Sequence, residues 1–124
     1  MAKMIKSYRD LLVWQKGMLL AKLVYSETQK FPDGERFGLT NQLRRAAVSV
    51  PSNIAEGYGR NSTLDYVRFL RMTVGSLYEI QTQLEIAMGQ GYLADDSNIK
   101  LTRLADELEK MLISMIAKIT KQKV

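Results

Sequence analysis

The polar side chains best placed to do chemistry lie in one short stretch, RRAAVSVPSNIAEGYGR at positions 44–60. Successive residues of a helix are rotated by about 100°, so side chains three and four positions apart share a face. Six polar residues of this stretch fall within roughly a third of a turn. Hydroxyl, amide, guanidinium and carboxylate groups on one face can pair with each other, hold a ligand or meet another subunit. We call these six residues the polar stripe: Arg45, Ser49, Ser52, Asn53, Glu56 and Arg60.

The sequence offers no nucleophile with a neighbouring base. It contains no histidine, which is the commonest general base and metal ligand. It also contains no cysteine, which excludes disulfides, thiolate metal sites and cysteine nucleophiles. We therefore expect no enzymatic activity and no catalytic residue.

Three glutamates can be compared with the metal ligands of helical bundles. Bundles often hold two metals with Glu and Glu-x-x-His pairs. Glu56, Glu79 and Glu85 could supply only a carboxylate site for Mg²⁺ or Ca²⁺. Ion pairing with arginine explains these glutamates better, so we expect no metal and no cofactor.

Length and composition describe one globular domain. The chain has 124 residues, of which 46% are hydrophobic, enough to form a core. No apolar run reaches the length of a membrane span. The N-terminal sequence MAKMIKSYRD lacks the apolar stretch of a signal peptide. We expect a cytoplasmic protein without a membrane segment.

The formal net charge of +5 comes from the first half of the chain. Residues 1–62 contain 10 Lys and Arg against 5 Asp and Glu, whereas residues 63–124 contain 8 of each. This excess is ordinary for a soluble domain, but it also permits binding to nucleic acid or to an acidic protein. The tail KITKQKV adds a weaker candidate for nucleic-acid contact. Our candidates for nucleic-acid contact are Lys3, Lys6, Arg9, Arg44 and Arg60.

The first two helices are predicted at about residues 8–30 and 37–58. FPDGERFG, with its proline, aspartate and glycine, favours a turn between them. In the first helix one apolar face is predicted through Leu11, Trp14, Met18, Ala21 and Tyr25, widened by Leu12, Leu19 and Leu23.

A proline, Pro51, falls inside the second predicted helix. It cannot donate a hydrogen bond to the carbonyl of Ala47, a defect that costs about 3 kcal/mol or more in a regular helix. We nevertheless predict one continuous, kinked helix, stopped by Gly57 and Gly59. The reason is that the apolar residues keep helical phase on both sides of the proline: Leu43, Ala47, Val50 and Ile54.

The third helix is predicted at about residues 62–89, where Ser62 and Asp65 resemble a capping box. Eight of its positions follow alternating steps of four and three, as in a heptad seam: Thr63, Val67, Leu70, Val74, Leu77, Gln81, Leu84 and Met88.

The fourth helix is predicted at about residues 97–122, after a turn that contains Asp95 and Asp96. Its two adjoining apolar stripes are Leu101, Leu104, Leu108, Met111 and Met115, and Ala105, Leu112, Ile116 and Ile119. Four helices of similar length with short connections predict an all-α fold, an antiparallel up-down-up-down four-helix bundle, as a single domain over residues 1–124.

The polar stripe allows two interpretations. It is either a solvated face or a surface that meets the third helix or another subunit. Small residues such as Ala46 and Ala55 would let another backbone approach, and Gly75, Glu79 and Thr82 form a comparable strip on the third helix. In the second interpretation Arg45 pairs with Glu56 or Glu79.

Three stretches of the sequence resemble a known family. They are YRDLLVWQKGMLLAKLVY, FPDGERFGLTNQLRRAAVSVPSNIAEGYGR and FLRMTVGSLYEIQTQLEIAMGQGYL, which together cover most of residues 8–93. They resemble the bacterial four-helix-bundle family named after intervening sequences in 23S ribosomal RNA genes. The middle stretch is highly specific as an ordered string.

The resemblance implies a left-handed antiparallel bundle that assembles into a homopentamer. Encoding inside ribosomal RNA genes points to a connection with RNA. The chain is also distantly similar to the accessory variability protein of diversity-generating retroelements, which resembles a basic pentamer that binds a reverse transcriptase and nucleic acid; a likeness of fold alone does not assign a function. The resemblance favours an intersubunit or ligand-facing role for six assembly candidates: Arg45, Ser49, Asn53, Glu56, Glu79 and Thr82.

These observations predict a non-catalytic oligomeric scaffold that binds RNA or a nucleic-acid-handling protein. The expected partners are further copies of the chain and RNA or a nucleic-acid enzyme, with no membrane. The alternative is a purely structural or protein-binding module without nucleic-acid contact. A bundle that binds a small ligand or a metal is a third, weaker alternative.

Overall fold

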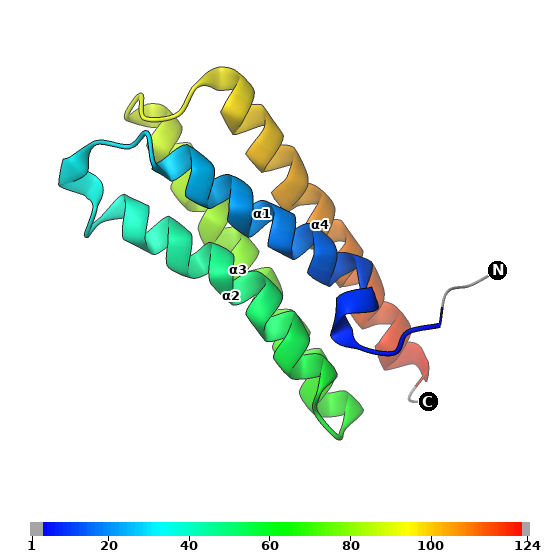
Figure 1. Ribbon diagram of the computed structural model, residues 1–124. Coiled ribbons are helices and arrows are strands. Elements are labelled where there is room, and N and C mark those ends of the chain that lie inside the picture. The colour runs from blue at the N-terminus through cyan, green and yellow to red at the C-terminus, as the bar shows by residue number, and fades with distance from the viewer. Residues whose placement is uncertain (1–3, 123–124) are drawn as a thin grey trace.

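The computed structural model describes residues 4–122, and every regular element in that range is a helix. Four of these helices are long, and each runs opposite to the one before it (Figure 1). They are α1 (Leu12–Thr28), α2 (Leu39–Tyr58), α3 (Thr63–Gly89) and α4 (Asp95–Gln122), with two short 3-10 helices, η1 (Tyr8–Asp10) and η2 (Asp33–Glu35).

The four helices pack in the cyclic order α1, α2, α3, α4. Each helix lies against two neighbours, and among the described residues neither diagonal pair brings its backbones together. The expected all-α four-helix bundle is therefore confirmed, while the left-handed twist stays a prediction.

The first predicted helix is divided in two, because local hydrogen bonds close a turn before α1. The Ser7 hydroxyl accepts the N–H of Arg9 at 3.1 Å, and the Asp10 carboxylate accepts the N–H groups of Lys6 and Ser7 at 2.8 and 3.2 Å. Leu11 is then extended, with φ −73° and ψ 126°. Sequence reasoning missed this capping box, although Ser7 and Asp10 have the required spacing.

The start of α4 also differs from the prediction. Asp95 and Asp96 belong to the first turn of α4 and not to the turn before it. Asp96 accepts the N–H of Ser97 at 2.9 Å, and carboxylates in a first turn interact favourably with the partial positive charge there. The N-cap of α3 is as predicted, since Ser62 accepts the N–H of Asp65 at 3.1 Å.

The helix α2 continues through Pro51, as the apolar phase predicted. Pro51 is buried, and α1 passes close to it at Gly17. A Cβ added to Gly17 would lie 3.1 Å from Val50 Cγ1 and 3.5 Å from the Pro51 nitrogen. The missing hydrogen bond therefore lies at a site where the two helices are in close contact.

Gly57 is not a helix stop, contrary to the prediction. It lies inside α2, buried, where a Cβ would be only 2.6 Å from the Cβ of Phe69 on α3. Gly57 therefore permits α2 and α3 to approach each other near their shared turn. Gly59 does cap the helix, and its N–H bonds back to the carbonyls of Ala55 and Glu56.

The core face of α1 differs from the predicted face by one residue, a rotation of about 100°. Because Gly17 has no side chain, the stripe through it turns toward α2, and the bulkier residues next to it lie at the edge of the core or in solvent. Trp14, which lies on the predicted apolar face, is partly buried, and the centre of its ring lies 5.3 Å from that of Tyr8. The buried residues of α1 are Val13, Gly17, Leu20, Val24 and Thr28.

The apolar stripes of the other helices agree better with the core. All four predicted positions of α2 are fully buried. On α3 the seam positions Leu70, Leu77 and Leu84 are buried, but Thr73, Ile80 and Ala87 from the adjoining stripe share the core, and Thr63 is exposed. On α4 the core residues are Leu101, Leu104, Ala105, Leu108, Leu112 and Ile116, with Met111, Met115 and Ile119 packed at the edge.

Candidate functional site

The assembly candidates lie on both sides of the seam between α2 and α3. Arg45 and Ser49 on α2, with Glu79 on α3, line a hollow of about 400 Å³. Asn53 lines a second hollow, of about 620 Å³, on the other side of Arg45 and Ser49. The structure therefore brings four of the six candidates around one patch of surface.

A direct hydrogen bond joins the two helices beneath the first hollow. The hydroxyl oxygens of Ser49 and Ser76 lie 2.7 Å apart, and the Ser49 hydroxyl also lies 2.6 Å from the carbonyl of Ala46. Sequence reasoning missed Ser76, although it is a small polar residue next to the predicted seam position Leu77. Small hydroxyl-bearing residues at this contact let the helices approach without leaving a polar atom unsatisfied.

The other two candidates have local hydrogen-bond partners. Glu56 pairs with Arg60 one turn later, at 3.1 Å, so it does not pair with Arg45. The Thr82 hydroxyl donates to the carbonyl of Tyr78 at 2.8 Å. Within residues 4–122 neither Arg45 nor Glu79 forms an ion pair. The predicted pairing of Arg45 is therefore not formed in one copy of the chain.

A buried glutamine lies next to the same seam. Gln83 on α3 is 8% exposed, and its Nε2 donates weakly to Gln42, which lines the first hollow, at 3.5 Å. Its Oε1 has no hydrogen-bond partner among the described residues. A buried acceptor without a partner destabilises the fold by about 1–3 kcal/mol.

Three nucleic-acid candidates gather at one end of the bundle. Because α1 and α3 begin where α2 and α4 end, the segment before α1, the α2–α3 turn and the last turn of α4 share that end (Figure 1). Lys118 and Lys121 on α4 reach it too. Lys3 lies outside the described residues. We call the following set the basic end: Lys6, Arg9, Arg60, Lys118 and Lys121.

Aromatic rings support two guanidinium groups at the basic end. Arg9 lies over the ring of Tyr8, and Arg60 over the ring of Phe69, each 4.7 Å from the centroid. These contacts hold the flat cations at the surface, where they remain exposed.

Arg44 lies apart from the other candidates and links α1 to α2. Its Nε donates to the Thr28 hydroxyl at 2.8 Å, and its guanidinium lies 4.7 Å from the centre of the Tyr25 ring. The structure thus places Arg44 in a helix–helix contact, which the sequence alone could not reveal.

No candidate metal site or membrane span was found among residues 4–122. No three acidic side chains in that range converge in a way that could hold a metal ion. None of its helices is both long and apolar enough to cross a membrane.

Burial, with a smaller contribution from Tyr58, raises the pKa of Tyr66 to about 12.

Comparison with known protein families identifies the family to which the chain belongs. The model of the family described as 23S rRNA-intervening sequence protein matches residues 9–114. The chain belongs to this family. Its matched region includes all six assembly candidates and reaches well into α4, whose sequence had shown only a helical pattern.

A solved structure supports the same fold. It is a crystal structure of a protein of unknown function from the S23 ribosomal protein family of Bacteroides thetaiotaomicron, with a TM-score of 0.77 and 22% sequence identity. The alignment covers 85% of this chain and 98% of that one, so most of this chain shares the fold of that protein. No curated protein is similar enough to count as a match.

Proposed function

We propose that this family member is a cytoplasmic, non-catalytic scaffold that assembles from several copies of itself and binds RNA. Five copies is the number that the family resemblance implies. The intervening-sequence name of the family supports a connection with ribosomal RNA. The observation that carries the proposal is the basic end, where cations from three separate segments of the chain meet.

The charges at this end favour binding to phosphates. Among residues 4–122, Lys6, Arg9, Lys118 and Lys121 take part in no ion pair. Nearby carboxylates are already engaged, Glu56 by Arg60 and Asp65 by Arg68. Repetition of this end around a ring would add the fields of several copies and attract a polyanion.

The salt dependence of RNA binding tests the proposal quantitatively. If these four cations neutralise about four phosphates of single-stranded RNA, the slope of log affinity against log salt should be roughly −2.8. The assay is fluorescence anisotropy of a labelled single-stranded RNA at low and at physiological salt. A flat dependence, or no binding even at low salt, would overturn the RNA proposal in favour of the protein-binding module.

Matched triple variants locate the RNA site. Lys6→Ala, Arg9→Ala and Lys121→Ala together remove three cations from the basic end and should weaken RNA binding at least tenfold. The control triple, with Lys22, Lys30 and Arg36 changed to Ala, removes the same charge elsewhere and should weaken it only about two- to threefold through the general field. Equal losses from both triples would show that the basic end is not the site.

Assembly is tested separately from RNA binding. The hollow lined by Arg45 and Glu79 offers one cation and one carboxylate without an ion-pair partner within residues 4–122, and Gly75 nearby has open space around it. A second copy could satisfy both charges. Light scattering should therefore give a mass of several chains for the native protein and a smaller mass for Arg45→Ala. A monomer mass at micromolar concentration would contradict assembly.

A further inference from the structure

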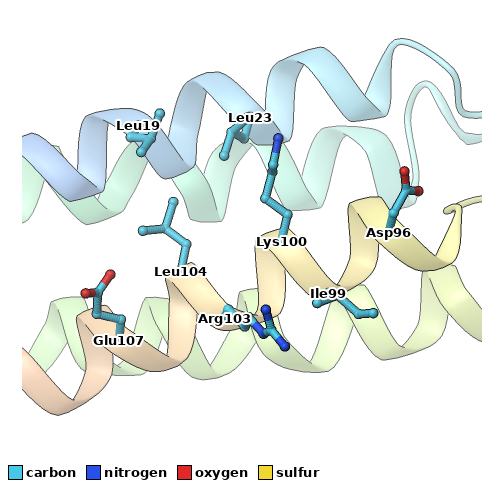
Figure 2. A pocket seen from close by; sticks show the side chains of 8 residues that line it. All are labelled: Leu19, Leu23, Asp96, Ile99, Lys100, Arg103, Leu104 and Glu107. Carbon is cyan, nitrogen blue, oxygen red and sulfur yellow. The ribbon is translucent and has the colours of Figure 1, made fainter.

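Two largely apolar hollows follow each other along the surface between α1 and α4, and together they form what we call the α1–α4 groove. Their volumes are about 760 and 570 Å³. Figure 2 shows the first, where Lys100 and Leu104 extend from α4 toward Leu19 and Leu23 on α1. The α1–α4 groove is defined by its apolar lining: Leu12, Leu19, Leu23, Ile99, Met111 and Met115.

The groove follows from uneven packing of α1. Gly17 lets α1 lie close against α2, and α1 packs more extensively on α2 than on α4. Large apolar side chains at the α4 edge consequently remain in solvent, with Leu12 54%, Leu19 48% and Ile99 49% exposed. Clustered apolar surface of this kind in a soluble protein marks an interaction site more often than scattered exposed residues do.

Four of the charged side chains that line the groove are cations without an ion-pair partner among the described residues. Lys100, Arg103, Lys110 and Lys118 line its two hollows, and none of them forms an ion pair within residues 4–122.

Two carboxylates also line the groove, and one of them is held in an ion pair. Asp96 accepts the N–H of Ser97 at 2.9 Å, and Glu107 pairs across the groove with Lys16 at 3.1 Å. The groove therefore presents an apolar floor with four cations that have no ion-pair partner within residues 4–122, against one carboxylate, that of Asp96, that forms no ion pair there.

We propose that the α1–α4 groove binds an acidic amphipathic helix of a partner protein. An apolar stripe on that helix would cover the floor, and carboxylates beside the stripe would meet the four cations. Nucleic acid fits this surface poorly, because its phosphates cannot cover an apolar floor. A bilayer is too flat to reach the bottom of a concave groove. The two methionines can adapt their shape to the side chains that enter.

The dimensions of the groove set the length of the partner helix. The 17 residues of α1 span roughly 25 Å, which a helix of about five turns would match. The middles of the two hollows are about 13 residues apart along α4, or roughly 20 Å. The partner helix should therefore carry two groups of apolar anchors separated by three to four turns.

A designed peptide provides a direct test. The probe is a fluorescein-labelled helix of about five turns with Leu on one face and Glu on the other, measured by anisotropy against the full chain. Two control peptides carry Lys in place of every Glu, or the same residues shuffled so that no apolar face forms. The acidic amphipathic peptide should bind at least tenfold more tightly than either control. Equal binding of all three peptides, or no binding, would overturn the proposal.

Variants of the protein locate the peptide. Lys100→Glu with Arg103→Glu should weaken binding at least tenfold, and so should Leu19→Gln with Ile99→Gln. The matched controls lie on α3, whose backbone does not approach that of α1 among the described residues: Arg68→Glu with Arg71→Glu, and Leu64→Gln with Ile86→Gln. All eight changed residues are exposed, and circular dichroism checks that each variant is folded.

Two results would reject the acidic partner. Equal weakening by groove and α3 variants would mean that the peptide binds elsewhere. Groove variants that lower the mass of the free protein in light scattering, without changing peptide binding, would show that a second copy of the chain occupies the groove. Neither result bears on RNA binding at the basic end, because the groove variants and the basic-end variants change different residues.

Discussion

Replacing Gly57 by Ala tests the close approach of α2 and α3. The new Cβ would lie 2.6 Å from Phe69 Cβ and 3.3 Å from Tyr66 Cδ1. Carbon atoms in contact are normally about 3.5–4.0 Å apart, so the first distance is about 1 Å too short. Phe69 Cβ is joined directly to the backbone and cannot swing aside, so α2 and α3 must separate near their turn.

The expected size of this effect combines two opposing contributions. Overpacking costs about 1–3 kcal/mol, and the better helix propensity of Ala recovers about 1 kcal/mol. The free energy of unfolding should therefore fall by up to about 2 kcal/mol. Gly75→Ala is the matched control, because no heavy atom lies within 4 Å of its added Cβ. That variant should be more stable than the native chain by up to about 1 kcal/mol.

Urea denaturation followed by circular dichroism measures both changes. All variants must be compared at one protein concentration, because assembly adds to the apparent stability. A Gly57→Ala protein as stable as Gly75→Ala would refute the close approach as the reason for glycine at this position.

Three further predictions concern single side chains. Arg44→Ala should lower the free energy of unfolding by about 1–2 kcal/mol in the same assay, because it removes the bond to Thr28 and the contact with Tyr25, whereas the exposed Arg71→Ala should change it by less than about 0.5 kcal/mol. Pro51→Ala should stay within about 1 kcal/mol of the native protein, since a restored hydrogen bond to Ala47 offsets the lost burial of the proline ring; a loss above about 3 kcal/mol would contradict this. The raised pKa of Tyr66 means that the folded chain holds the phenol proton more tightly than the unfolded chain, whose tyrosine keeps the usual value of 10.0. This stabilisation should be complete below pH 10 and disappear as the pH rises to about 12. Tyr66→Phe should lose less stability over that interval, and identical pH profiles would count against the shift.

The sequence alone determined which segments are helical and roughly where they end. Apolar residues repeating every three or four positions identify a helix without knowledge of its neighbours. For the same reason the unbroken phase around Pro51 predicted a continuous α2, and Ser62 predicted the start of α3. The lack of histidine and cysteine likewise limits the available chemistry, whatever the fold, because neither side chain can be supplied by packing.

Only the tertiary structure decided which face of each helix is buried and what its polar groups contact. On α1 two overlapping apolar stripes compete, and the close approach of α2 at Gly17 selects the less bulky one. Gly57 has the sequence signature of a helix stop, but it proved to be a contact point because Phe69 lies across from it.

The charged residues depend on the fold in the same way. Arg44 and Arg60 look equivalent in sequence, but Arg44 is held between α1 and α2, whereas Arg60 joins Lys6 and Lys121 at the basic end. The up-down order of the helices brings these distant segments together, and the unequal packing of α1 opens the α1–α4 groove. Periodicity within a helix records its own faces, whereas contacts between helices depend on residues far apart in the chain.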